Sequence, residues 1–210
     1  FGGKRTLAPE IVAELGEHSA YWELFCGSMA VLLAKEPATM ETVNDLHGDL
    51  INLARVVQND ALSVDLFAKL YRTACSEPQH RIAAERHRER GNIAATETPC
   101  VDRAADYFLC SWLGRNGVAG TSSYNQGFCR RFTKNGGHAA KRFASAVESI
   151  PEWWDRLRHV TILNDDAFEL VDRIEAILPQ ALSAANRSMV ASWPTQGSIV
   201  QAMSSRRALT

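Results

Sequence analysis

The sequence predicts an α/β fold in which a parallel β-sheet is interrupted by a long, mainly helical insert. Two observations predict this fold. Strand patterns alternate with helical patterns before residue 60 and after residue 158, an order typical of parallel sheets. Residues 60–158 between them contain helical and loop patterns only. With 46% apolar and 22% charged residues, the 210-residue chain can bury a core of one domain with a subdomain.

The first part of the chain is expected to supply most of the sheet. A helix is expected at residues 8–15 and a strand at 19–25, where apolar and polar residues alternate. A helix at residues 28–35 would begin with Ser28 as its N-cap. A short strand at 40–44 and an amphipathic helix at 49–59 follow.

The insert is expected to contain helices at residues 60–75, 78–90, 102–113, 139–149 and 151–157. Residues 114–137 are rich in Gly and Asn and predict a long loop, and loops of this length in compact domains are usually functional. His80 and His87 lie in a stretch of mixed charge, which favours a solvated helix face over a ligand pair. A strand at 159–163 and a helix at 167–178 return to the sheet.

The turn Phe25-Cys26-Gly27-Ser28 joins the first strand to a helix, an arrangement typical of nucleoside-cofactor sites. Gly27 lets the backbone approach a ligand, and the first amides of the helix would point towards it. Asp45 follows the second strand, 18 positions after Gly27, where an acidic residue can accept from ribose hydroxyls. The alternative role of Asp45 is a helix N-cap, and the two roles can coexist.

Asp165 and Asp166 follow the third predicted strand. Carboxylates at the carboxyl ends of parallel strands lie at the ligand-binding edge of the sheet. The alternative is again a helix N-cap, here for the helix that begins at Ala167.

The charge is unevenly distributed, although the net charge is only −1. Residues 107–147 contain six basic residues and no Asp or Glu, with Tyr124, Phe128 and Phe132 among them, whereas the rest has 17 basic and 24 acidic residues. Basic and aromatic side chains together suit a phosphate backbone and bases. The alternative interpretation is a solvated basic loop without a binding role. The complete lack of Asp and Glu favours a role in binding nucleic acid.

Five cysteines without a CxxC pair favour reduced thiols in a cytosol over disulfides or a zinc site. No apolar run approaches the roughly 18 residues that cross a bilayer, so no membrane contact is expected. The residues 176–210 contain no Asp or Glu and show no clear periodicity. We expect this tail to be disordered or an out-of-frame translation rather than an ordered domain.

Four motifs occur in one order, GGK, ELFCGS, NDLHGDLIN and ILNDDAFEL, with GRNGVAGTSSYNQGF and NGGH between the last two. In this order the chain resembles the Dam-type, phage-like DNA adenine-N6 methyltransferases over about residues 1–174. The resemblance implies a Rossmann-like S-adenosylmethionine-dependent methyltransferase fold with an incomplete sheet and a helical DNA-recognition insert. It also implies double-stranded DNA as partner, no metal, and the cytoplasm of a bacterium or of a phage-infected host.

The resemblance implies four parts: residues 1–59 for the cofactor, 60–158 as the helical insert with its basic DNA-binding loop, 159–178 as the return to the sheet, and 179–210 as an atypical tail. The cofactor residues it implies are Lys4, Glu23, Phe25, Gly27, Ser28, Asp45, Asp166 and Phe168. The DNA-binding residues it implies are Arg115, Asn116, Tyr124, Asn125, Arg130, Arg131, Lys134, His138, Lys141 and Arg142.

Three positions or segments depart from the family pattern. Leu24 stands where the family usually has Pro, and Met29 where it often has Gly, and both fit a strand end and a helix start. The (Asp/Asn)-Pro-Pro-(Tyr/Phe) motif, which accepts from the target amine and stacks on the base, is absent from the chain, and Trp193-Pro194 is a poor substitute. No catalytic residue is therefore assigned, and we expect little or no methyl transfer from this chain.

Two other functions are compatible with parts of the pattern. A non-catalytic module could bind S-adenosylmethionine or DNA, and the missing Pro-Pro motif favours it over an active enzyme. A nicotinamide-dependent oxidoreductase could use a similar turn. However, the chain lacks the GxGxxG sequence of such enzymes, and this function would not explain the acid-free basic segment.

Overall fold

A computed structural model describes residues 6–91, 93–115, 127–130 and 138–174 of the chain. The described residues form two compact units. One, the helical unit, contains residues 47–162, and the other, the sheet unit, contains residues 6–46 and 163–174. The predicted tail and most of the predicted loop at 114–137 lie outside the described residues.

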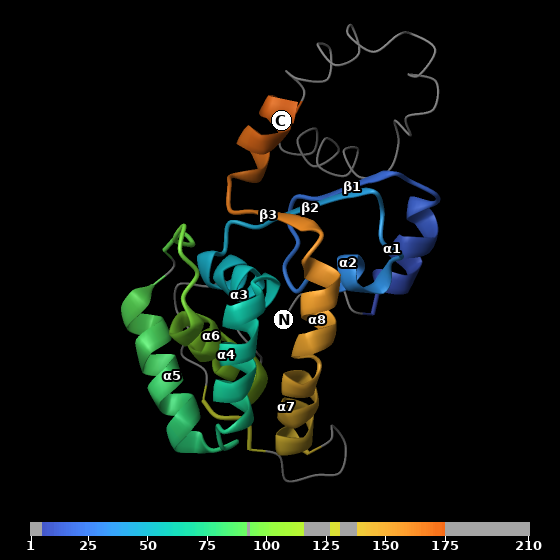
Figure 1. Cartoon of the computed structure of the whole chain (residues 1–210). Helices are drawn as coiled ribbons and strands as arrows, with labels where there is room; N and C mark the ends of the chain where they lie inside the picture. The colour runs from blue at the N-terminus through green and yellow to red at the C-terminus, as the bar shows by residue number, and fades with distance from the viewer. Residues whose placement is uncertain (1–5, 92, 116–126, 131–137, 175–210) are drawn as a thin grey trace, which may run out of the picture. The chain divides into compact units, whose positions relative to one another are not determined.

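The strands are β1 (Ala20–Glu23), β2 (Met40–Asn44) and β3 (Val160–Leu163), in the sheet order β1-β2-β3 (Figure 1). β1 pairs with β2 in parallel, with Ala20 opposite Met40 and Glu23 opposite Val43. The parallel pairing confirms the α/β prediction. The strands are short, and β2 is buried after its first residue, as expected for a parallel sheet covered on both faces.

Helices α1 (Ala8–Leu15) and α2 (Ala30–Ala34) belong to the sheet unit and pack against each other. Pro9 lies in the first turn of α1, where a missing N–H is tolerated, and Gly16 follows its end with a φ of 61°. The predicted N-cap of the next helix is wrong. The residue before α2 is Met29, in the left-handed region at φ 54°, and it makes no side-chain cap bond. Ser28 instead lies inside the turn.

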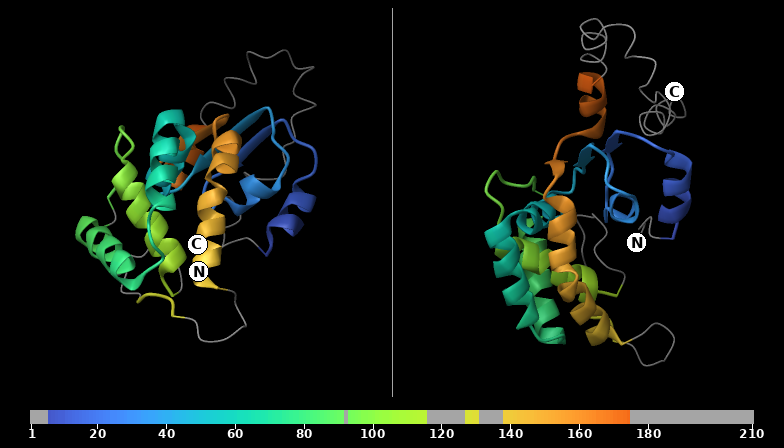
Figure 2. Two further views of the ribbon diagram at one scale, coloured as in Figure 1. Left: turned by 60° about the horizontal axis from the view of Figure 1, so that its bottom comes forward. Right: turned by 45° about the vertical axis from the view of Figure 1, so that its right-hand side comes forward.

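The helical unit contains α3 (Gly48–Gln58), α4 (Asp60–Tyr71), α5 (Glu77–Arg90), α6 (Val101–Leu113), α7 (Ala139–Glu148) and α8 (Ile150–Leu157). In both views of Figure 2, α7 and α8 (yellow to orange) follow one another almost end to end, and α8 contacts α3 and α4. α6 is the central one, and it packs against α3, α4, α5 and α7. The buried ring of Phe108 on α6 contacts the rings of Trp112, Phe143 and Trp153 at centroid distances of 5.9–6.2 Å. An aromatic cluster therefore forms the core of this unit.

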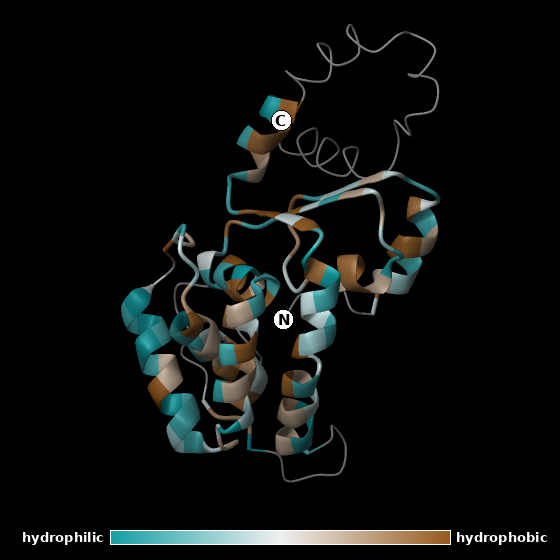
Figure 3. Cartoon of the chain, viewed as in Figure 1, coloured by the Kyte–Doolittle hydropathy of each residue, from teal (hydrophilic) through white to brown (hydrophobic). Residues whose placement is uncertain are grey.

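α5 is strongly hydrophilic, as the teal ribbon of Figure 3 shows, and its histidines contradict the sequence-based expectation. His80 and His87 are buried rather than solvated, with exposed fractions of 3% and 6%. Arg103 and Asp106 on the adjoining face of α6 are buried as well. Polar side chains of the two helices meet in a buried ionic contact, which hydrophobic periodicity does not detect.

No helix among the described residues is long and apolar enough to cross a bilayer. The functional division into four parts, with boundaries at residues 59, 158 and 178, stays a prediction.

Candidate functional site

The turn after β1 is bonded to the end of β2. The amide of Gly27 donates to Oδ2 of Asp45 at 2.8 Å, and the amide of Cys26 donates to the carbonyl of Asn44 at 2.9 Å. The turn closes on itself because the amide of Met29 donates to the carbonyl of Cys26 at 2.8 Å. Gly27 has a φ of 49°, a conformation that favours glycine. A Cβ at this position would meet no described atom within 4 Å, so the space beside the turn can admit a ligand.

Asp45 is not the N-cap of the helix that follows it. The cap of α3 is His47, whose Nδ1 accepts from the amide of Leu50 at 3.2 Å. Asp45 and Gly27 are thus brought together as the sequence predicted, and the alternative role of Asp45 as a helix cap is wrong.

Asn44 ties the three chain segments at the strand ends together. Its Nδ2 donates to the carbonyls of Leu24 and Asp165 at 3.1 and 3.0 Å, and its Oδ1 accepts from the amide of Asp165 at 2.9 Å. Asn164 donates to the carbonyl of Asp45 at 2.7 Å. Sequence reasoning missed both asparagines. The signal was a repeated pattern, because an apolar residue, Asn and Asp follow one another at the end of both strands, as residues 43–45 at β2 and as residues 163–165 at β3.

Asp165 and Asp166 have different partners. Oδ2 of Asp165 pairs with Arg173 at 2.8 Å. Oδ1 of Asp166 accepts from the amides of Phe168 and Glu169 at 2.8 and 3.2 Å, so Asp166 caps the helical residues 167–174. The helix-cap alternative is therefore confirmed for Asp166, and a second role towards a ligand stays a prediction.

Two aromatic rings lie together in the sheet unit. Phe25 and Phe168 are 53% and 39% exposed, and their rings meet edge to face with centroids 6.2 Å apart. Their chain neighbours Leu24, Leu170 and Val171 form part of a buried apolar cluster. Exposed aromatic rings suit contact with a flat heterocycle.

Glu23 belongs to a buried polar cluster rather than to an open surface. It is 6% exposed and accepts from the hydroxyl of Tyr21 at 2.9 Å. Lys35 pairs with Glu41 at 2.5 Å and lies 4.7 Å from the centroid of the Tyr21 ring. Burial, and secondarily the charge of Glu23, raises the pKa of Tyr21 above its ordinary value. Tyr21 therefore stays a donor and fixes the Glu23 carboxylate.

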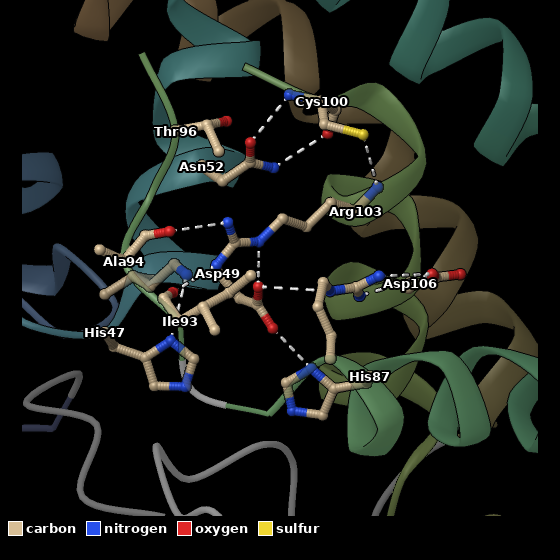
Figure 4. Close-up of polar contacts among 12 residues, drawn as sticks. His47, Asp49, Asn52, His87, Ile93, Ala94, Thr96, Cys100, Arg103 and Asp106 are labelled. Atoms are coloured by element: carbon tan, nitrogen blue, oxygen red, sulfur yellow. Dashed lines mark hydrogen bonds and ion pairs between the residues drawn. The ribbon is translucent and has the colours of Figure 1, made fainter. Parts of the chain in front are cut away.

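The helical unit contains a second polar cluster, centred on Asp49 in the first turn of α3 (Figure 4). Oδ1 of Asp49 accepts from Nε of Arg103, and Oδ2 lies 2.6 Å from Nδ1 of His87. Arg103 also donates to the carbonyls of Ile93 and Ala94 at 2.7 and 3.0 Å. Burial by itself would raise the pKa of Asp49, but hydrogen bonds from His87 and Arg103 lower it below its ordinary value.

The segment before α6 is fixed to α3 by two further contacts. Asn52 exchanges two hydrogen bonds with the backbone of Cys100, at 2.9 and 2.8 Å. Gly48 lies against the backbone of residues 93–95, and a Cβ there would come within 2.0 Å of the carbonyl oxygen of Ile93. Sequence reasoning missed this cluster because Asp49 contacts His87 and Arg103, which lie 38 and 54 positions further along the chain.

The predicted DNA-binding residues fall into two groups. The described ones, Arg115, Arg130, His138, Lys141 and Arg142, are all exposed. Arg130 pairs with Glu77 of α5, and both side chains are more than half exposed. Lys4 of the cofactor set and Asn116, Tyr124, Asn125, Arg131 and Lys134 of the DNA set lie outside the described residues.

The described residues on either side of the segment 116–126 lie next to each other. Gly114 and Phe128 form an antiparallel bridge. On either side of it, the amide of Arg115 donates to the carbonyl of Gly127 at 3.1 Å, and the amide of Cys129 donates to the carbonyl of Leu113 at 2.8 Å. We call residues 113–115 and 127–129 the neck. The neck is ordered backbone within the stretch that was predicted to be a loop throughout.

Among the described residues, no three His, Cys, Asp or Glu side chains are grouped so that they could bind a metal ion. A comparison with curated protein sequences finds no match. A family model described as D12 class N6 adenine-specific DNA methyltransferase matches residues 1–178, which is most of the chain.

Proposed function

The chain belongs to the D12 class N6 adenine-specific DNA methyltransferases, and on that premise we propose that its sheet unit binds S-adenosylmethionine at the ends of β1, β2 and β3. Enzymes of this family transfer a methyl group from S-adenosylmethionine to adenine in DNA. The observation that carries the proposal is the bond from Gly27 to Asp45 beside two exposed aromatic rings.

Each part of the cofactor has a residue of matching chemistry. The carboxylate of Asp45 can accept from the ribose hydroxyls, and the rings of Phe25 and Phe168 can contact the adenine face. Asp166 can accept from the adenine amine, in addition to capping the helix. We assign Lys4 and Ser28 to the methionine end of the cofactor, and the buried Glu23, held by Tyr21, to support of the turn that follows β1. When bound, the cofactor supplies an electrophilic methyl group on a positively charged sulfur.

The exposed side chains of Arg115, His138, Lys141 and Arg142 are assigned to the DNA backbone. We assign Arg130 to the same surface, although Glu77 is its present partner. Exposed ion pairs contribute at most about 1 kcal/mol, so DNA phosphates can compete for this guanidinium. The proposed DNA-binding set is completed by residues outside the described part of the chain, namely Asn116, Tyr124, Asn125, Arg131 and Lys134.

Family members take the target adenine out of the duplex, and catalysis then depends on positioning the amine and accepting its proton. The (Asp/Asn)-Pro-Pro-(Tyr/Phe) motif that does this work is absent from these 210 residues. We therefore propose that the chain binds cofactor and DNA but transfers methyl groups poorly. The non-catalytic binding module is the second candidate function, and the missing motif is the observation that favours it.

Radiolabelled S-adenosylmethionine distinguishes these outcomes in one experiment. We expect equilibrium dialysis to show retention of the label by the chain, and we expect little label to enter adenine-containing duplex DNA. Efficient transfer into DNA would contradict the proposed impairment and leave the cofactor site standing. Failure to retain the label would contradict the cofactor site itself.

A further inference from the structure

Two residues one turn apart on α5 contact Phe128 of the neck and Arg130, which directly follows the neck. Glu77 pairs with Arg130, and the ring of His80 lies 6.0 Å from the ring of Phe128. Residues i and i+3 lie on one face of a helix. The amide of Arg130 donates to the carbonyl of Phe128 at 3.0 Å, so residues 128–130 form a tight turn, and two side chains of this turn lie against one face of α5.

The two contacts differ in strength. The Glu77–Arg130 pair is exposed, with exposed side-chain fractions of 52% and 60%, and exposed pairs contribute at most about 1 kcal/mol. His80 is only 3% exposed, and burial lowers its pKa despite the opposing charge of Glu77. A neutral, buried imidazole is a suitable packing partner for Phe128. The Phe128–His80 contact therefore contributes most of the free energy that holds residues 128–130 against α5, and the Glu77–Arg130 pair orients them.

The bonds of the neck connect the α5 contact to Arg115 on the other chain of the neck. Gly114 and Phe128 lie opposite each other in a pair without mutual hydrogen bonds, and the flanking bonds join Arg115 to Gly127 and Cys129 to Leu113. Fixing Phe128 against α5 therefore also fixes Arg115 on the other chain of the neck. Arg115 is exposed and begins the part of the acid-free stretch that carries its charges.

We propose that His80 and Phe128, aligned by Glu77 and Arg130, are positioning residues that hold Arg115 and Arg130 of the acid-free stretch for contact with the DNA backbone. The inference rests on the proposed function, because it assumes that this stretch binds DNA. It adds residues of α5, which lie outside the acid-free stretch, to the determinants of DNA affinity.

The test compares Phe128→Ala, Phe128→Leu and the control Tyr71→Ala, which removes an exposed aromatic ring from α4. Fluorescence anisotropy with a labelled duplex gives the DNA dissociation constant, and calorimetry gives that for S-adenosylmethionine. An aromatic contact contributes about 0.5–1.5 kcal/mol beyond area burial, so we expect Phe128→Ala to weaken DNA binding up to about tenfold. Phe128→Leu keeps apolar burial but not the ring-to-ring contact, so its DNA affinity should lie between those of Phe128→Ala and the unchanged chain, and Tyr71→Ala should bind DNA like the unchanged chain.

Three results would overturn the inference. If Phe128→Ala binds DNA as tightly as the unchanged chain, the neck does not position the DNA-binding stretch. If Phe128→Ala also loses cofactor binding and cooperative thermal unfolding while Phe128→Leu behaves normally in every assay, the contact serves the fold as a whole. If the unchanged chain binds cofactor but no duplex, the proposed DNA function fails together with the inference, whereas the first result leaves that function intact.

Discussion

The carboxylate of Asp45 accepts a hydrogen bond from the backbone amide of Gly27 at 2.8 Å, although 18 residues separate them. The bond joins the turn after β1 to the residue after β2, at the carboxyl ends of two parallel strands. Ligands of open parallel sheets bind at this edge. The geometry of the Gly27–Asp45 bond leads to predictions that distinguish effects on ligand affinity from effects on the free energy of unfolding.

Replacing Gly27 with Ala tests whether the left-handed turn serves the ligand. The substitution meets no described atom within 4 Å, so its cost is conformational, about 1–2 kcal/mol for the φ of 49°. Gly16→Ala is the control for backbone strain at another site, because Gly16 also has a positive φ, 61° with a ψ of −167°, and equally open surroundings. We expect both variants to lose stability in urea unfolding, and only Gly27→Ala to bind S-adenosylmethionine more weakly. Equal cofactor affinities would contradict the role of the turn.

Asn44 should be the residue whose loss most disturbs the strand ends. Asn44→Ala leaves the carbonyls of Leu24 and Asp165 and the amide of Asp165 without this partner, at a site 1% exposed. Unsatisfied buried groups cost about 1–3 kcal/mol each, so we expect a loss of about 3 kcal/mol in the free energy of unfolding. Asn59→Ala, which removes a cap from α4, should cost only about 1 kcal/mol. Similar losses in the two variants would contradict the tying role of Asn44.

Asp49 should make the stability of the helical unit depend on pH. Its pKa is lowered in the folded state, so its stabilising effect is complete above its ordinary pKa, near 3.9, and is lost as the pH falls through the lowered value. Breaking a buried ion pair costs about 3–5 kcal/mol, which is the loss expected for Asp49→Asn at pH 7. Denaturant unfolding across pH 2–7 should show the difference from the unchanged chain shrinking towards the acid end.

Asp102→Asn is the control for that prediction. The pKa of Asp102 is also lowered, by hydrogen bonding to Lys69, but the Lys69–Asp102 pair is exposed, with side-chain fractions of 45% and 71%. An exposed pair contributes at most about 1 kcal/mol, so this variant should unfold almost like the unchanged chain at pH 7. A large loss from Asp102→Asn, or none from Asp49→Asn, would contradict the account of the cluster.

Gly48→Ala should separate α3 from the segment at residues 93–95. A Cβ would lie 2.0 Å from the carbonyl oxygen of Ile93, and that oxygen also accepts from Arg103. The backbone must move, so we expect a loss of about 1–3 kcal/mol from overpacking. Hydrogen exchange should show faster exchange at the start of α6 as well as in α3. Unchanged exchange there would mean that the segment moves independently of the cluster.

The local elements could be predicted from the sequence, because they depend on periodicity and on residues close in the chain. α1 and β2 occur at the predicted residues, and the helices of the insert lie near theirs. The polar clusters could not be predicted. Asp49 contacts Arg103 across 54 residues, and Asn44 contacts Asp165 across 121. His87 was misassigned to solvent because a helix rich in charge can bury its histidines against another polar helix.

The measurement that tests the central claim most directly is a calorimetric titration of S-adenosylmethionine into the unchanged chain, Asp45→Ala and Asp65→Ala. Asp65 is an exposed aspartate on α4 and serves as the matched control. We expect roughly micromolar binding by the unchanged chain and by Asp65→Ala, and at least about tenfold weaker binding by Asp45→Ala. Equal affinities in all three chains, or no binding by the unchanged chain, would contradict the assignment of the cofactor site.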